Sequence, residues 1–110
     1  MKYISGSVVI IDLGMSPFGH EQSGLRPAVF LSMQNNVALV IPLTSNTSAL
    51  RRSGTISILA TKQNGLDTTS IALVFQMRAV DIRRIIKSIG VLGSKEKKLI
   101  NKILRTITTI

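Results

Sequence analysis

The sequence has no cysteine, no tryptophan, only five acidic residues and a single histidine among its 110 residues. Without cysteine the chain forms no disulfide and offers neither a thiolate metal ligand nor a cysteine nucleophile. One histidine and five scattered carboxylates predict no dedicated metal site and no bound cofactor. No apolar run approaches the roughly 20 residues that a membrane-spanning helix needs. The N-terminal residues also lack the pattern of a signal peptide, so the sequence predicts a cytoplasmic protein with no membrane partner.

Acidic residues are few, whereas basic residues are many. Fourteen Lys and Arg face five Asp and Glu, which gives a formal net charge of +9 at pH 7. Such an excess favours a polyanionic partner, either a nucleic acid, an acidic protein or an anionic membrane surface. A basic surface that only keeps the protein soluble is the alternative. One Tyr and three Phe are too few for a protein that binds single-stranded RNA mainly by stacking.

The hydrophobic content of 45% comes mostly from Ile, Leu, Val and Ala, which favours strands. Short apolar runs separated by polar or Gly-rich segments predict strands at 7–13, 27–32, 37–42, 55–59, 70–80 and 87–92, a long loop at 14–25, and turns at 33–36 and 64–65. A short turn or helical segment is expected at 82–84. In the 70–80 run, Gln76 and Arg78 should share one face, while Ile71, Leu73, Phe75, Met77 and Ala79 face the core.

An amphipathic helix is expected at the C-terminal end of the chain. Ser94 is its predicted N-cap, and Glu96 lies in the first turn, where a carboxylate suits the helix dipole. Apolar residues then recur at helical spacing: Leu99, Ile100, Ile103, Leu104 and Ile107. The pattern as a whole predicts a mainly β fold, a small barrel or twisted sheet with a C-terminal helix, formed by a single domain over residues 1–110. An apolar interface would add stability to so small a domain, so a homodimer is expected.

Three polar clusters stand at strand ends or on a strand face, where a rigid scaffold holds reactive groups. They are Gly19-His20-Glu21-Gln22 running on to Arg26-Pro27, then Pro42-Leu43-Thr44-Ser45-Asn46, and Gln76-x-Arg78 followed by Asp81. The planar guanidinium of an arginine and the hydroxyl of a threonine are suited to binding a phosphodiester. Asp81 is expected to cap the next turn or to pair with Arg83 or Arg84.

These clusters resemble the motifs of a known family. The run GHEQSGLRPAVFLS is similar to the G-x-E-Q-x-G-x-R-P motif of the MazF/PemK/Kid toxins. VIPLTSN resembles the following strand with its P-x-T-S end, SIALVFQMRAVDIRRI the later Q-x-R strand, and VLGSKEKKLINKIL the closing strand and helix. The resemblance covers nearly the whole chain, in the order of the family.

The resemblance implies an SH3-like small β-barrel of the CcdB/MazF/PemK type with a C-terminal helix, assembled as a homodimer. It implies the toxin of a type II toxin-antitoxin system, an endoribonuclease that cleaves single-stranded mRNA selectively without a metal. In that chemistry the 2′-hydroxyl attacks the adjacent phosphate and leaves a 2′,3′-cyclic phosphate and a 5′-hydroxyl end. The implied protein partner is an acidic antitoxin.

By the same resemblance, Arg26 and Thr44 match the catalytic arginine and threonine of the family. His20 stands where the plasmid-borne members carry a histidine, and it is either catalytic or a polar loop residue. The implied substrate-binding residues are Glu21, Gln22, Ser45, Gln76 and Arg78. The alternatives stay open: a surface arginine before a strand proline, a strand-ending threonine, a loop-shaping role for Glu21 and Gln22, and a polar outer sheet face for Gln76 and Arg78.

Phe75 departs from the pattern, because the plasmid-borne members have a catalytic aspartate immediately before the glutamine of the third motif. A phenyl ring accepts no proton, so a mechanism that depends on that carboxylate is unavailable here. Either Arg26 and Thr44 suffice, or the chain is a non-catalytic toxin on the same fold, an RNA binder or a gyrase inhibitor of the CcdB type.

Overall fold

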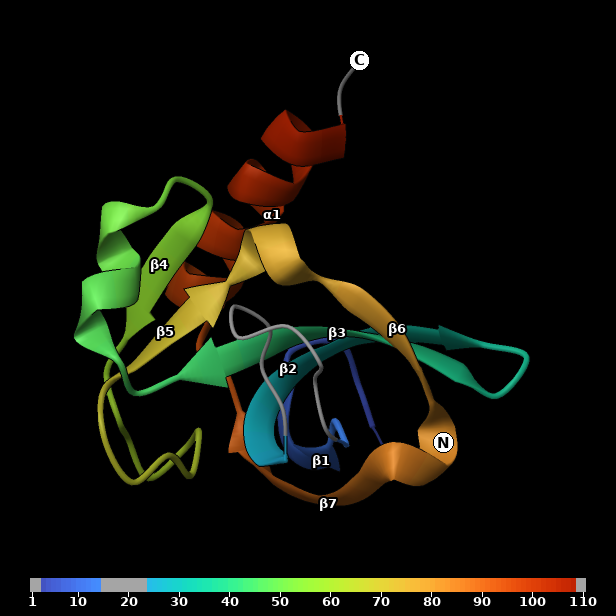
Figure 1. Ribbon diagram of the computed structural model, residues 1–110. Coiled ribbons are helices and arrows are strands. Elements are labelled where there is room, and N and C mark those ends of the chain that lie inside the picture. Colours follow the sequence, from blue (N-terminus) through green and yellow to red (C-terminus); the bar gives the residue numbers. More distant parts are fainter. Residues whose placement is uncertain (1–2, 15–23, 109–110) are drawn as a thin grey trace.

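The computed structural model describes residues 3–14 and 24–108, and these ranges contain seven strands, three 3-10 helices and one α-helix (Figure 1). The elements follow in the order β1 (Ser7–Asp12), β2 (Leu25–Gln34), β3 (Val37–Thr44), η1 (Thr47–Arg51), β4 (Thr55–Ile58), β5 (Ser70–Leu73), η2 (Val74–Gln76), β6 (Arg78–Asp81), η3 (Ile82–Arg84), β7 (Ile85–Val91) and α1 (Ser94–Thr108). The predicted mainly β fold with a C-terminal helix is confirmed.

The strands form one antiparallel sheet in the order β4-β5-β3-β2-β1-β7, with β6 paired to β3 as well. β3 is the central strand: β2 lies along one edge, while the other edge pairs first with β6, at Val37–Val40, and then with β5, at Leu43 and Thr44. The curved part of the sheet is therefore β6-β3-β2-β1-β7. Among the described residues no ladder joins β6 to β7, so the barrel stays open there, and η3 links the two strands.

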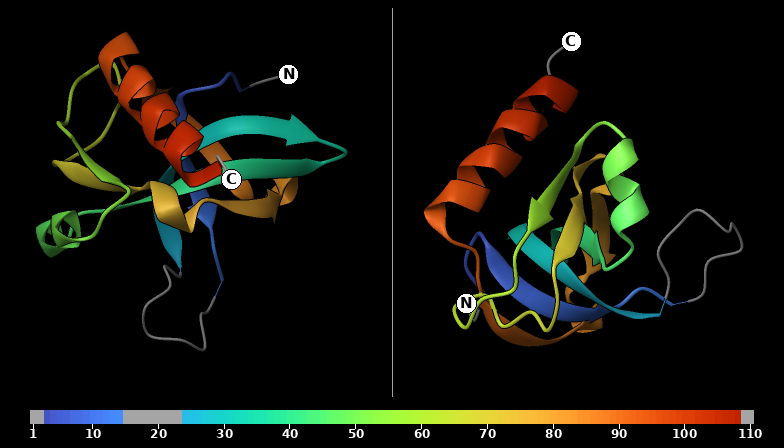
Figure 2. Two further views of the ribbon diagram at one scale, coloured as in Figure 1. Left: turned by 90° about the horizontal axis from the view of Figure 1, so that it is seen from above. Right: turned by 90° about the vertical axis from the view of Figure 1, so that its left-hand side faces the viewer.

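The β2–β3 hairpin projects beyond the rest of the sheet (Figures 1 and 2). Its turn is Asn35-Asn36, with φ of 53° and 64° at the two residues. Two positive φ angles are the mark of a type I′ turn, whose twist matches that of the flanking strands. The sequence-based prediction located this hairpin, but its strands run two residues further at Gln34 and at Thr44 than expected.

The predicted long strand at 70–80 is wrong. The chain forms β5, leaves the sheet as the short helix η2, and returns as β6. All four β5 residues are buried, so no polar face alternates with a core face there. Phe75, expected in the core, is 41% exposed, and Ala79 is exposed as well. The break occurs because the two halves of the segment pair with different parts of β3.

The sheet is buried on both faces. The barrel core fills the inside of the curve and consists of Val9, Ile11, Leu13, Ala28, Phe30, Ala38, Val40, Val80 and Ile85. The helix-side core lies on the other face, under α1, and consists of Val8, Val29, Ile41, Leu43, Ile58, Ala72, Val74, Leu92 and Ile100. Burial on both faces explains why these strands are continuous apolar runs without a polar alternation.

Helix α1 covers the helix-side core, as the two views of Figure 2 show. Ile100 is its buried anchor, and Ile103 and Leu104 pack beside it. The helix begins at Ser94, and the Lys97 backbone N–H donates to the Gly93 carbonyl at 3.2 Å. Gly93 is therefore the N-cap, one residue before the predicted Ser94. Among the described residues no helix combines the length and apolarity needed to cross a membrane.

Candidate RNA-binding and catalytic site

Arg26 and Thr44 lie at the same end of the sheet, on neighbouring strands. Ala28 of β2 faces Pro42 of β3, and continuing this register by two residues on each strand sets Arg26 across from Thr44. Side chains of cross-strand partners lie on one face of a sheet. Both side chains therefore belong to the face of the barrel core, at its outer end. The two residues that the sequence singled out from separate motifs share one location.

The end of β3 is held by a chain of hydrogen bonds. The Thr44 side chain is buried to 8% exposure, and its Oγ1 accepts from the Asn46 backbone N–H at 3.1 Å. Asn46 in turn caps η1, because its Oδ1 accepts from the Ser48 backbone N–H at 3.1 Å and from the Ser48 hydroxyl at 2.7 Å. Because Thr44 acts as the acceptor in its bond with Asn46, its hydroxyl keeps its own hydrogen for a further bond. The polar segment after β3 thus contains the short helix η1, which begins directly after Asn46.

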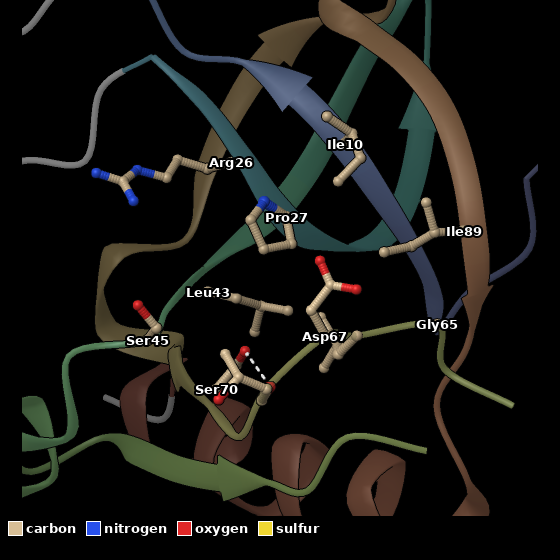
Figure 3. Close-up of a pocket in the computed structure, with 11 residues that line it drawn as sticks. Ile10, Arg26, Pro27, Leu43, Ser45, Gly65, Asp67, Ser70 and Ile89 are labelled. Carbon is tan, nitrogen blue, oxygen red and sulfur yellow. Dashed lines mark hydrogen bonds between the residues drawn. The ribbon is translucent and has the colours of Figure 1, made fainter. Parts of the chain in front are cut away.

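A cavity of about 230 Å³ lies next to Arg26, on the opposite face of the strands (Figure 3). Its lining is Ile10, Arg26, Pro27, Leu43, Ser45, Gly65, Leu66, Asp67, Thr68, Ser70 and Ile89. In Figure 3 the Arg26 guanidinium points away from the cavity, while the Asp67 carboxylate points into it. Thr44 is not part of the lining. The cavity and the Arg26–Thr44 pair are therefore two neighbouring features that meet at the edge of the sheet.

One wall of the cavity is the segment that follows the Asn64-Gly65 turn. Asn64 is buried at 4% exposure, and its side chain makes three hydrogen bonds to the backbone. Its Oδ1 accepts from the backbone N–H groups of Thr61 and Leu66, both at 3.0 Å, and its Nδ2 donates to the Leu59 carbonyl at 2.8 Å. The sequence predicted the turn but not the cavity. The polar run Asp67 to Ser70 was the available signal, and only the fold brings it against β1, β2 and β7.

Gln76 and Arg78 do not join the cavity. Gln76 ends η2 and Arg78 begins β6, so they do not lie side by side on one strand as predicted. Arg78 pairs with Val40, which sets it on the same face as Thr44 but four residues away along β3, about 14 Å at the usual rise of a strand. Phe75 lies next to Gly54, and its backbone N–H donates a hydrogen bond to the Gly54 carbonyl at 3.4 Å.

The predicted residues His20, Glu21 and Gln22 lie outside the described residues. The described ends of that segment are joined, because the Leu13 backbone N–H donates to the Gly24 carbonyl at 2.9 Å and the Gly24 N–H donates to the Gly14 carbonyl at 2.6 Å. These bonds extend the β1–β2 pairing by two residues beyond Asp12. Gly24, two residues before Arg26, is thereby fixed against the end of β1.

Asp81 caps η3 and pairs with Arg83, and this prediction is confirmed. Its Oδ1 accepts from the Arg83 backbone N–H at 2.8 Å, and its Oδ2 lies 2.9 Å from the Arg83 guanidinium. The hydrogen bond to the Arg83 side chain, and next the backbone bond, lower the pKa of Asp81 to about 2. The Arg84 side chain donates instead to the Asp12 carbonyl at 3.0 Å. Among the described residues no three His, Cys, Asp or Glu side chains gather as a metal-binding group.

The sequence of residues 4–108 matches the family model of the PemK-like, MazF-like toxins of type II toxin-antitoxin systems. The chain belongs to this toxin family. The predicted membership of the MazF/PemK family is thereby confirmed. No curated protein sequence matches the chain significantly.

Solved structures of MazF proteins share the fold of this toxin. MazF from Deinococcus radiodurans superposes with a TM-score of 0.81 at 19% identity, over 100% of this chain and 99% of that one. The MazE-MazF structure from the same organism superposes with a TM-score of 0.71 at 19% identity, over 97% of this chain and 96% of that one. An endoribonuclease in complex with its cognate antitoxin from a mycobacterial species superposes with a TM-score of 0.65 at 16% identity, over 96% of this chain and 91% of that one. The predicted SH3-like barrel of the CcdB/MazF/PemK type is confirmed.

Proposed function

We propose that this MazF-like toxin is an endoribonuclease that cleaves single-stranded mRNA without a metal, with Arg26 and Thr44 at its catalytic centre. The observation that supports this most is the strand register that sets Arg26 across from Thr44 at the outer end of the barrel core. An exposed guanidinium next to a hydroxyl on a rigid strand end is a pair suited to a phosphodiester. The mycobacterial endoribonuclease of the same fold adds support.

In the proposed reaction the ribose 2′-hydroxyl attacks the adjacent phosphorus. A new bond forms between O2′ and phosphorus, the bond between phosphorus and O5′ breaks, and the products are a 2′,3′-cyclic phosphate and a 5′-hydroxyl. The 2′-hydroxyl proton passes to a base and a proton is delivered to O5′. His20, whose ordinary pKa lies near neutrality, is the proposed base or acid.

Arg26 stabilises the extra negative charge of the pentacoordinate phosphorane, which is the electrostatic contribution that usually dominates in such chemistry. Thr44 donates to a phosphoryl oxygen, and its own acceptor role toward Asn46 fixes the direction in which its hydrogen can point. Neither role needs a carboxylate at position 75. Glu21, Gln22, Ser45, Gln76 and Arg78 are the proposed substrate contacts, with Ser45 directly after Thr44 and Arg78 further along the same face.

The test is incubation of the purified protein with a long single-stranded RNA in EDTA, followed by mapping of the cut sites and their end groups. Discrete cuts with 5′-hydroxyl ends are expected. Arg26→Ala should lower the cleavage rate by about 10²–10³-fold, the usual cost of removing one donor to the transition state. Lys102→Ala, which removes one positive charge from α1, is the matched control and should cut like the wild type.

Full activity in a folded Arg26→Ala variant would remove that residue from the mechanism. Intact RNA with the folded wild-type protein would favour the second candidate, a non-catalytic RNA-binding or gyrase-inhibiting toxin. Phe75 is the observation behind that candidate, because it is 41% exposed where the plasmid-borne members carry a catalytic carboxylate.

Two protein partners are part of the proposal: an acidic antitoxin and a second copy of the chain. The net charge of +9 suits both RNA and an acidic peptide, and a MazF from Deinococcus radiodurans is solved together with MazE. Exposed large apolar side chains such as Leu25, Leu59 and Ile86 offer surface for an interface. Light scattering should give twice the 11.9 kDa mass of one chain, and a mass near 11.9 kDa at assay concentration would refute the homodimer.

A further inference from the structure

The proposed reaction assigns no role to the cavity beside Arg26. Its upper and side walls are apolar and come from Ile10, Pro27 and Ile89 on three adjacent strands. Its floor is polar and comes from the loop before β5 (Figure 3). One group in it is charged and directed inward, the Asp67 carboxylate.

We propose that this cavity binds a guanine base of the RNA substrate, and that Asp67 recognises the base. The proposal rests on the proposed function, since it assigns the cavity to the same substrate. It makes Asp67 a specificity-determining residue, and it leaves the catalytic roles of Arg26 and Thr44 unchanged.

The size and walls of the cavity suit one base. Pockets for drug-sized ligands measure about 300–1,000 Å³, so a cavity of about 230 Å³ takes a smaller, flat fragment. The pyrrolidine ring of Pro27 and the side chains of Ile10 and Ile89 provide apolar surface against which a ring can lie. Single-stranded RNA is read in this way, by splaying a base from the strand into a pocket and hydrogen-bonding its edge.

The chemistry of Asp67 selects among the four bases. An ionised carboxylate only accepts hydrogen bonds, and the described residues donate none to Asp67. Guanine presents two adjacent donors, N1–H and N2–H, that match the two carboxylate oxygens. Adenine and cytosine set an acceptor nitrogen next to their amino group, and uracil flanks its one N–H with two carbonyls. Guanine is therefore the base that this acceptor pair fits best.

The position of the cavity also suits a strand of RNA whose phosphate is held by Arg26. Arg26 and Pro27 are consecutive on β2, so their side chains point to opposite faces of the sheet. At the same edge, the consecutive residues Thr44 and Ser45 also lie on opposite faces, and Ser45 is the one that lines the cavity. RNA that crosses this edge can set a phosphate against Arg26 and Thr44 and turn a neighbouring base into the cavity.

The test compares binding of two 2′-O-methyl RNA hexamers, which lack the attacking hydroxyl, by fluorescence anisotropy. One carries a single guanine in a uracil background, and the other carries hypoxanthine in its place, which lacks only the N2 amino group. The wild-type protein should bind the guanine oligomer about tenfold more tightly, the value of one hydrogen bond to a charged acceptor. Asp67→Asn, which replaces two acceptors by one acceptor and one donor, should abolish the difference.

Glu96→Gln on α1 is the matched control, because it removes the same charge from a residue that does not line the cavity and should keep the tenfold preference. Equal binding of the two oligomers by the wild type overturns the proposal, and so does a guanine preference that is retained in Asp67→Asn. Equal binding is the result expected if the cavity instead takes a lysine or arginine of a partner protein. The cleavage assay separates the two proposals. A wild type that cuts RNA but ignores the amino group refutes only the guanine site, whereas one that cuts nothing refutes the proposed function.

Discussion

At the scale of single residues, the site depends on side chains whose backbone is already fixed by strand pairing. Arg26 and Thr44 could be named as candidate site residues from the sequence, because each stands in a motif that resembles one of the toxin family. Their adjacency could not, since it follows from the register between β2 and β3, in which Ala28 faces Pro42. Asp67 could not be predicted either. It is an unremarkable loop aspartate until the fold turns it toward Pro27 and Ile89.

Asp81 gives a prediction about pH. Its pKa is lowered from 3.8 to about 2 by Arg83, so the folded state holds it charged more readily than the unfolded chain does. A carboxyl group whose pKa is lower in the folded state stabilises the fold at pH values above its pKa in the unfolded chain. This stabilisation is lost as the pH falls toward its pKa in the folded state. The contribution should thus be complete above about pH 5 and disappear between pH 3.8 and about 2.

Asp81→Asn keeps an oxygen to cap η3 but removes the ion pair. Because Arg83 is 87% exposed, the effect on the melting temperature should be small at neutral pH. The measurement is thermal melting of both proteins from pH 6 down to pH 2. The two melting temperatures should converge at the acid end, and a gap that widens there would contradict the assignment.

At the scale of elements, the hydrophobic pattern predicts which segments are strands but not with which neighbour each strand pairs. The 70–80 segment is the clearest case. Its local alternation is that of one strand, yet Leu43 and Val40 of β3 pair with its two halves separately, at Ala72 and at Arg78. The helix η2 between them is fixed by the Gly54 carbonyl, which accepts from the Val74 N–H at 3.0 Å. Such long-range pairing leaves no mark on the local sequence.

The turn at Asn64 is the element on which the cavity wall depends. Asn64→Ala should remove three hydrogen bonds made by a buried side chain and leave its partly buried backbone partners unpaired, at a cost of about 2–3 kcal/mol in the free energy of unfolding. For a chain of this size that corresponds to a fall in melting temperature of roughly 10 °C. Urea titration and calorimetry would measure it.

Asn46→Ala is the matched control, because Asn46 is an exposed asparagine that caps only the short helix η1. Its loss should cost about 1 kcal/mol or less. Equal destabilisation by the two substitutions would mean that burial of Asn64 contributes nothing to its effect.

At the scale of the whole molecule, the net charge of +9 is the property that follows most directly from the sequence. Binding of RNA should therefore weaken as salt rises, because each phosphate contact releases counterions. If about four to six phosphates are neutralised, the slope of log K against log salt for single-stranded RNA should be about −3 to −4. Titration of a 2′-O-methyl RNA at several salt concentrations measures it, and a slope near zero would argue against an electrostatic interface.

The central position of β3 has a consequence for how the molecule opens. β3 is hydrogen-bonded along both edges, to β2 on one side and to β6 and β5 on the other, and its side chains enter both cores. We expect the amide protons in the middle of β3 to exchange only when the sheet separates as a whole, so that their hydrogen exchange reports the global free energy of unfolding. Thr44 is the last residue of β3, so the proposed catalytic hydroxyl stands at the end of the strand that is expected to exchange most slowly.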